Sequence, residues 1–213
     1  GRSAVLVAGL LAIAAAASRA PAAEPILRLP VTVDVASRLQ EIDGFGVNVT
    51  PAQWRDGALR PTLDLLVDDL GTSLVRLDCW GKADWLDPAK RSADGRWPEA
   101  YLSEVYCSRV FTECWDTFRH LSAKGADVHL NVSGRIPAAW ARPDGQTLVD
   151  FDAYAEAAVS QALWAREQEG LRFRVFAPFN ETNLGFPEGP RIRDADVVTA
   201  VRAVAKRMDA AGL

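Results

Sequence analysis

Four short, mostly apolar segments recur along the chain, and each predicts a buried β-strand. Strands that are buried on both faces of a sheet have this near-continuous apolar pattern. Residues with helical spacing of apolar positions follow each of them, so strand and helix alternate four times. This alternation predicts βα units and hence a parallel sheet. The strands are expected at residues 41–50, 73–80, 127–134 and 172–181, and the helices at 57–71, 108–124, 153–169 and 195–212.

The ends of the predicted helices carry ordinary stop and start signals. Gly71, Gly125 and Gly170 each follow a helix, as helix-terminating glycines do. Asp150 or Asp152 is expected to cap the third helix, and Asp194 the fourth. The connections after the helices are therefore very short.

The loops that follow the strands are long and hold most of the Trp, Arg, Asn, Asp and Glu residues, which favours a barrel. In (β/α) barrels the functional site is built from these loops. A doubly wound sheet shares this polarity, but the segment "GFGVNVT" lacks the full glycine-rich phosphate loop. We therefore predict an α/β fold, namely the first four units of a (β/α)8 TIM barrel in residues 41–213. A half barrel leaves strand edges and an apolar interior open. We thus expect an incomplete chain that is inactive and poorly soluble by itself.

The amino-terminal segment predicts export. Residues 1–23 combine Arg2, an apolar run and a small-residue exit, which is the layout of a secretory signal peptide. An uncleaved membrane anchor is the alternative, although the apolar run is short for a span. Residues 24–40 alternate enough to predict one or two strands of a side β-module. We expect a secreted or periplasmic bacterial protein, with no membrane association after cleavage.

Composition narrows the range of partners. The net charge of −4 gives no basic excess, so we expect no nucleic-acid partner. No Cys/His cluster has metal-ligand spacing, and we predict neither a metal nor a cofactor. For the three cysteines, a Cys79–Cys107 disulfide and three unpaired thiols both remain open.

Hydrogen-bonding side chains stand at all four predicted strand ends and indoles at three of them, which predicts a carbohydrate-binding surface. A sugar ring is bound by an aromatic face and by amide or carboxylate partners for its hydroxyls. Three interpretations compete with carbohydrate binding. Trp140 could cover the loops, Arg76 and Asp78 could form an ion pair, and the three Asn-X-Thr/Ser sequons could carry N-linked glycans. The candidate residues are Asn48, Arg76, Asp78, Trp80, Asn131, Ser133, Trp140, Asn180, Glu181 and Asn183.

The same segments resemble a known enzyme family. "IDGFGVNVT", "LVRLD", "LNVSGRIPAAW" and "FAPFNETNLGFPEGP" are together similar to clan A glycoside hydrolases, closest to family 30-like O-glycosyl hydrolases. The resemblance extends over residues 31–213 in the right order. Its most specific element is the Asn-Glu pair at 180–181, and "IDGFG" is the next.

The resemblance implies a retaining hydrolase with a specific division of roles. Glu181 would be the acid/base, Asn180 would bind the sugar 2-hydroxyl, and Arg76 would support the nucleophile. The nucleophile would be a second Glu that has no counterpart in this chain; Asp78 and Glu188 are weaker candidates within it. Burial and a neighbouring carboxylate are expected to raise the pKa of Glu181. The alternative function is a carbohydrate-binding pseudoenzyme on the same barrel.

Overall fold

The computed structural model describes residues 29–81 and 86–213, except for the side chains of residues 79–81. The chain divides into two compact units, residues 1–41 and 42–213. In the first unit, residues 29–41 contain one turn and no strand. The predicted signal peptide lies outside the described residues. In the described part of the chain, no helix combines the length and apolarity needed to span a membrane.

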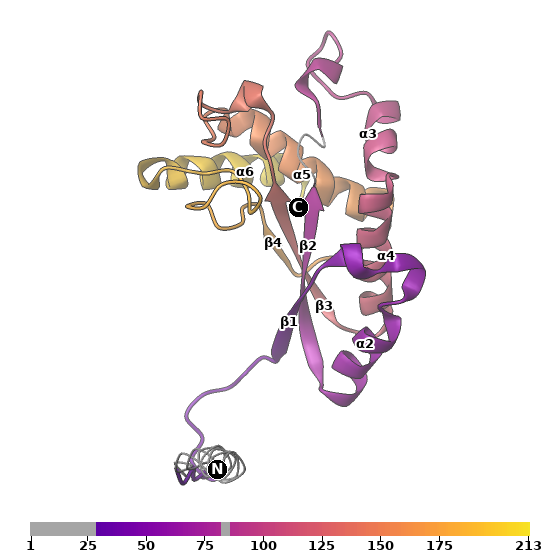
Figure 1. Ribbon diagram of the computed structural model, residues 1–213, viewed down its shortest axis with the longest axis vertical. Helices are drawn as coiled ribbons and strands as arrows, with labels where there is room; N and C mark the ends of the chain where they lie inside the picture. The colour runs from indigo at the N-terminus through magenta and orange to yellow at the C-terminus, as the bar shows by residue number, and fades with distance from the viewer. Residues whose placement is uncertain (1–28, 82–85) are drawn as a thin grey trace, which may run out of the picture. The chain divides into compact units, whose positions relative to one another are not determined.

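The second unit is built on four parallel strands that are hydrogen-bonded in chain order, β1-β2-β3-β4 (Figure 1). The predicted parallel βα repeat is therefore confirmed. Closure into a (β/α)8 barrel and the side β-module stay predictions. The strands are β1 (Phe45–Val49), β2 (Thr72–Gly81), β3 (Asp127–Gly134) and β4 (Val175–Ala177).

Helices connect the strands, and α2 and α4 lie along the same flank of the sheet while α5 and α6 pack against each other (Figure 1). The α-helices are α2 (Arg60–Asp64), α3 (Glu99–Tyr106), α4 (Arg109–Ala123), α5 (Phe151–Glu167) and α6 (Val197–Ala211). A π-turn, η3 (Leu65–Asp69), continues α2, and five 3-10 turns complete the unit: η1 (Pro51–Gln53), η2 (Arg55–Gly57), η4 (Pro88–Lys90), η5 (Ala138–Trp140) and η6 (Asp194–Asp196).

The main core lies between α4 and one face of the central strands. Val75 and Leu77 of β2 and Val128 and Leu130 of β3 are buried there against the apolar side of α4. Trp115 of α4 is fully buried, and its indole N–H donates to the Tyr106 carbonyl at 3.0 Å. Burial of one face leaves the alternate residues of β2 and β3 on the opposite face, because side chains alternate along a strand.

A second core supports the loops that follow β2 and β3. Trp97 and Trp140 are buried and meet edge to face, with ring centroids 6.3 Å apart. The Arg91 guanidinium stacks 4.1 Å above the Trp97 ring and lies 3.0 Å from the Glu156 carboxylate on α5. The described part of the loop after β2 is thereby fastened to α5.

The bonding state of the cysteines differs from both interpretations that the sequence left open, a Cys79–Cys107 disulfide and three unpaired thiols. Cys107 is a free, exposed thiol, which excludes a Cys79–Cys107 disulfide, and Cys114 is disulfide-bonded, which excludes three unpaired thiols. The side chain of Cys79 lies outside the described residues.

Element boundaries differ from the predicted ones where local geometry competes with the apolar pattern. The fourth strand is only three residues long, so Asn180 and Glu181 lie beyond its end rather than on it. Helix α3 was not predicted, because its hydrophobic pattern is interrupted by exposed polar residues. The last helix begins after η6, and Asp194 does not cap it; Asp196 occupies the cap position and accepts from Arg193 instead.

The amino-terminal cap of α5 gives a stability prediction. The Asp150 carboxylate accepts from the Ala153 N–H at 3.0 Å, which confirms Asp150 rather than Asp152 as the cap. Asp150→Ala leaves that N–H without its partner, and we expect the free energy of unfolding to fall by about 1 kcal/mol. Urea unfolding followed by circular dichroism measures it. Asp152→Ala, in the same helical turn, is the matched control; an equal loss in both variants contradicts the capping role.

Candidate functional site

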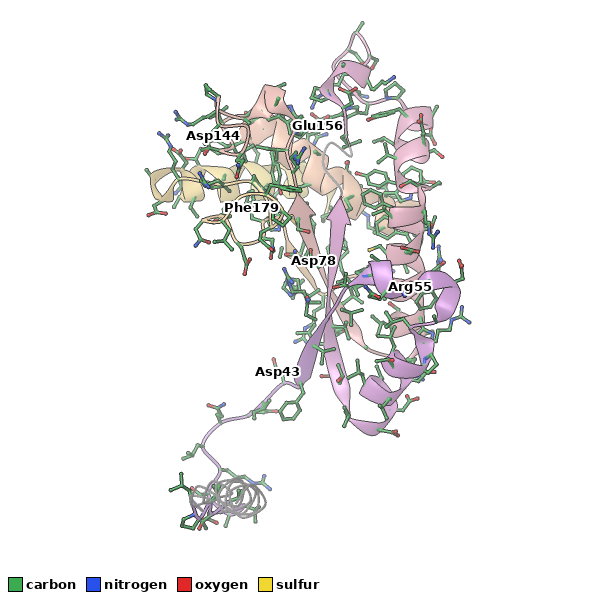
Figure 2. The ribbon with its side chains drawn as sticks, viewed as in Figure 1. Asp43, Arg55, Asp78, Asp144, Glu156 and Phe179 are labelled. Atoms are coloured by element: carbon green, nitrogen blue, oxygen red, sulfur yellow. The ribbon has the colours of Figure 1, made fainter. Side chains whose placement is uncertain are left out.

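The polar face of the sheet brings several predicted residues together. Asn48 of β1, Arg76 of β2 and His129 of β3 share one row of the register. Asp78 and Asn131 share the next row towards the carboxyl ends of the strands. Because neighbouring strands lie about 4.8 Å apart, side chains in one row are within contact distance. Figure 2 shows Asp78 on the sheet and Phe179 and Asp144 on the loops beyond it.

The Arg76 guanidinium is the hub of this face. Its Nη1 donates to Asn48 Oδ1 at 2.8 Å, and its Nη2 donates to Asn180 Oδ1 at 2.5 Å. Its Nη1 also lies 3.8 Å from a carboxylate oxygen of Asp78. One cation thus connects β1, β2 and the segment after β4.

Asp78 organises the upper part of β3. Its Oδ1 accepts from Asn131 Nδ2 at 2.9 Å and from the Ser133 hydroxyl at 2.6 Å. All three residues are buried. A buried carboxylate requires hydrogen bonds and a nearby cation, and here both are present.

Asn180 is held by its whole side-chain amide. Its Oδ1 faces Arg76, and its Nδ2 donates to the Glu188 carbonyl and to Glu188 Oε2, each at 3.0 Å. This arrangement fixes the amide orientation, because only the nitrogen can donate to the two acceptors of Glu188. Gly189 permits the close return of the loop, since a Cβ there would lie 2.7 Å from the Asn180 carbonyl oxygen.

A tyrosine from α5 anchors the chain just before Asn180. The Tyr154 hydroxyl donates to the Pro178 carbonyl at 2.6 Å, and its ring stacks on Phe179 with centroids 5.1 Å apart. Burial raises the pKa of Tyr154, so the hydroxyl remains a donor at all physiological pH values. The segment is therefore fixed despite the shortness of β4.

Glu181 follows this anchored segment and is exposed. We expected it to be buried; it is exposed because the strand ends at Ala177 and the chain turns before Glu181. Its φ of 37° lies in the left-handed region, which costs a non-glycine residue of order 1–3 kcal/mol. No hydrogen bond joins its carboxylate to another residue in the described part of the chain.

The other predicted residues divide by location. Asn183 is exposed on the same loop as Glu181. Trp140 is buried and packs against Trp97, so it lies beneath the loops and not at an open surface. The side chain of Trp80 lies outside the described residues.

Two contributors were missed or underestimated by the sequence analysis. His129 lies beside Arg76; burial and then the guanidinium charge lower its pKa, and its Nε2 is buried with no hydrogen-bond partner among the described residues. Glu188 was considered only as a nucleophile, whereas its contacts are with Asn180. The register of β2 and β3 puts His129 beside Arg76, but the return of the loop to Asn180 has no sequence signal except Gly189. Within the described residues, no group of three His, Cys, Asp or Glu side chains has the geometry of a metal site.

Comparison with known proteins shows what this fold is similar to. No family model and no curated protein matches the chain. A glycoside hydrolase family 30 subfamily 8 xylanase from Clostridium acetobutylicum matches with a TM-score of 0.56 and 16% identity, over 83% of this chain and 42% of the xylanase. A family 30 endoxylanase from Clostridium papyrosolvens C71 gives a TM-score of 0.48 and 18% identity, over 70% and 36% of the two chains.

The first of these comparisons confirms at the level of fold the resemblance that the sequence motifs predicted. The four-stranded parallel sheet and its helices have the fold of part of a family 30 glycoside hydrolase. The chain spans less than half the length of the solved structures that it matches.

The Asp78 cluster gives a second prediction. Asp78→Ala leaves two buried donors, Asn131 and Ser133, without their acceptor, and we expect the free energy of unfolding to fall by about 2–4 kcal/mol. Asp78→Asn keeps an acceptor oxygen and is expected to lose less. Urea unfolding of the full-length protein measures both.

Asp127→Ala is the matched control for Asp78→Ala. Asp127 begins β3, is half exposed and pairs with exposed Arg174 at 3.0 Å, so its removal is expected to cost at most about 1 kcal/mol. Equal losses for Asp78→Ala and Asp127→Ala contradict the assigned importance of the buried cluster.

Proposed function

We propose that the protein is a retaining O-glycosyl hydrolase that cleaves an oligo- or polysaccharide by double displacement. Glu181 is the acid/base, Asn180 binds the sugar 2-hydroxyl, and Arg76 supports the nucleophile electrostatically. The observation that carries the proposal is the hydrogen-bonded Arg76, which joins Asn48 to Asn180 directly before the exposed Glu181. The similarity of the fold to a family 30 glycoside hydrolase supports it.

The proposed chemistry requires a second carboxylate. A retaining glycosidase has two carboxyl groups about 5–5.5 Å apart, one of which donates a proton to the leaving oxygen while the other attacks the anomeric carbon. The attacking carboxylate is proposed to lie outside residues 1–213. In the first step Glu181 gives its proton to the leaving oxygen, and in the second step its carboxylate takes a proton from the attacking water.

Asn180 can bind a sugar hydroxyl in two ways that its contacts define. One lone pair of Oδ1 remains beside the Arg76 bond and accepts from a hydroxyl. Both N–H groups of Nδ2 already donate to Glu188. A hydroxyl oxygen therefore receives a bond from Nδ2 only by taking the place of the Glu188 carboxylate.

The remaining polar residues shape the surface below the sugar in this proposal. The surface below the sugar is formed by four hydrogen-bonded residues, Asn48, Asp78, Asn131 and Ser133. Asn183 adds a polar group from the loop that contains Glu181. Trp80 is retained as a proposed stacking residue, and Trp140 as a support beneath the loop. No cofactor takes part in this mechanism.

The substrate is proposed to be a structural polysaccharide outside the cell. The solved structures with similar folds are described as a xylanase and an endoxylanase. Soluble xylan is therefore the first substrate to test, followed by mixed-linkage β-glucan. A secreted or periplasmic location, as the amino-terminal sequence predicts, fits a polymer that cannot enter the cell.

A non-catalytic carbohydrate-binding protein is the alternative. The Glu181 carboxylate has no hydrogen-bond partner in the described part of the chain, so no contact there holds it in place as a proton donor, and this favours the alternative. This alternative predicts sugar binding by the same polar face without any turnover.

Replacement of Glu181 separates these functions. In the full-length protein, Glu181→Gln should reduce kcat on xylan by at least about 100-fold, because the leaving oxygen then receives no proton. Glycosides with activated aryl leaving groups should lose much less in the first step, and azide should restore turnover in Glu181→Ala. Initial rates with both substrate types measure this.

Glu104→Gln, on the exposed side of α3, is the matched control and should leave turnover unchanged. Unchanged turnover of xylan by Glu181→Gln contradicts the acid/base role. Binding of xylan without turnover by the unmodified protein supports the alternative.

Glu188 gives a further prediction, as a residue that positions Asn180. Glu188→Ala removes one acceptor from Asn180 Nδ2 and should lower kcat/KM by about 3–10-fold, the usual effect of one hydrogen bond. Glu188→Gln keeps an acceptor oxygen and should recover most of this loss. If Glu188 were the nucleophile, Glu188→Gln would instead lower kcat/KM by several orders of magnitude. Added azide would then give a glycosyl azide of inverted configuration.

A further inference from the structure

The loop after β4 holds Glu181 in a tight turn near its start. The Leu184 N–H donates to the Glu181 carbonyl at 2.9 Å, and the Ile192 N–H donates to the Thr182 carbonyl at 2.9 Å. These bonds fix the backbone of the loop relative to itself. Because they leave the side chain of Glu181 exposed, its position depends on where the whole loop lies.

A cation–π contact joins this loop to the end of β3. The Arg135 guanidinium carbon lies 4.3 Å from the centroid of the Phe186 ring, well within the roughly 6 Å over which an aromatic face attracts a cation. Arg135 directly follows Gly134, the last residue of β3. Phe186 belongs to the loop that contains Glu181, so the contact connects that loop to the sheet.

Backbone hydrogen bonds join the same two loops at a second place. The Arg191 N–H donates to the Gln146 carbonyl at 2.9 Å, and the Leu148 N–H donates to the Arg191 carbonyl at 2.8 Å. Gly185, which precedes Phe186, permits the close approach, because a Cβ at this position would collide with Gln146 Oε1. The loop after β4 is thus bound to the loop after β3 both at Phe186 and where it returns.

The loop after β3 can serve as an anchor because its own turn is fixed. Oδ1 of Asp144 (Figure 2) accepts from the Gln146 N–H at 2.9 Å and from the Thr147 N–H at 2.8 Å. Its Oδ2 accepts from the Thr147 hydroxyl at 2.6 Å. These three bonds hold the turn in the conformation in which the Gln146 carbonyl meets Arg191.

We propose that Arg135 and Phe186 form a clamp that positions Glu181 for proton transfer. The clamp binds the loop after β4 to the end of β3, and it acts on Glu181 through the loop backbone rather than through a bond to the carboxylate. Proton transfer depends on such placement, because a shift of about 1 Å can cost about 100-fold in rate. Arg135 is therefore a positioning residue. The proposal rests on the proposed function and deepens it, because it names the contact that holds the acid/base in place.

Hydrogen–deuterium exchange tests the clamp independently of turnover. In the full-length protein, Arg135→Ala and Phe186→Leu should each raise the exchange rate of peptides that cover residues 181–192 by about two- to fivefold, the factor that corresponds to one exposed cation–π contact. Phe186→Tyr keeps an aromatic face and should exchange like the unmodified protein. The double variant should exchange no faster than either single variant, because both remove the same contact.

Arg60→Ala is the matched control. Arg60 begins α2, and its guanidinium carbon lies 5.1 Å from the Trp54 ring centroid, so this variant removes a similar contact from another part of the unit. Exchange in residues 181–192 should stay unchanged in Arg60→Ala. Equal exchange of these residues in the Arg135→Ala, Phe186→Leu and Arg60→Ala proteins overturns the clamp.

The leaving group of the substrate tests whether the clamp positions the acid. Arg135→Ala should lower kcat/KM for xylan by at least about fivefold, and kcat/KM for an aryl xyloside with an activated leaving group by less than about twofold, because only xylan needs the proton of Glu181. An equal fall for both substrates, or no fall for xylan, overturns the positioning role even where exchange has risen.

Failure of the proposed function gives a different result. If the unmodified protein cleaves neither substrate, the hydrolase function fails. A selective rise in exchange in Arg135→Ala and Phe186→Leu then still supports the clamp as the contact that holds the Glu181 loop, whereas unchanged exchange overturns the clamp as well.

Discussion

The candidate site depends on one cation that is partly enclosed by amides and a carboxylate. Arg76 is placed in the middle of the sheet, where an arginine without partners would be costly. Its guanidinium is satisfied by Asn48, by Asn180 and by the nearby charge of Asp78. The planar group has fixed donor directions, so it imposes an orientation on each partner rather than only neutralising charge. Asn180 immediately precedes Glu181. The hydrogen bond between Arg76 and Asn180 therefore also fixes the backbone from which the side chain of the proposed acid extends.

The loops that follow the strands obtain their order from the helical layer. The loop after β2 is fastened to α5 by Arg91 and Glu156, and the segment before Asn180 is fastened to α5 by Tyr154. Helix α5 thus supports the site from outside the sheet, although none of its residues was predicted to bind substrate. This division is typical of parallel α/β folds, in which the scaffold is rigid and the loops at the carboxyl edge carry function.

The sequence predicted the sheet well because the pattern of a mostly apolar strand followed by a helix occurs four times. The segment at 127–134, in which apolar and polar residues alternate, matches β3. Gly71, Gly125 and Gly170 adopt the positive φ that short connections after helices use. The polar face was also predictable, since Arg76 and Asp78 alternate with Val75 and Leu77. The fourth strand was predicted too long, because Phe179 continues the apolar run but packs on Tyr154 instead of extending the sheet. The contact of Glu188 with Asn180 could not be predicted, since it depends on how the loop after β4 returns to a residue already in place.

The engagement of Asn131 and Asn180 also bears on how the protein can be produced. Asn48, Asn131 and Asn180 all stand in Asn-X-Thr/Ser sequons, and all three amides take part in the hydrogen bonds of the polar face. A eukaryotic secretory pathway attaches glycans to nascent chains before they fold, when these asparagines are still accessible. A glycan on the Asn180 nitrogen would occupy the space in which the Glu188 loop closes. Yeast or mammalian secretion would therefore hinder assembly of this surface, whereas a bacterial host without that modification leaves it intact.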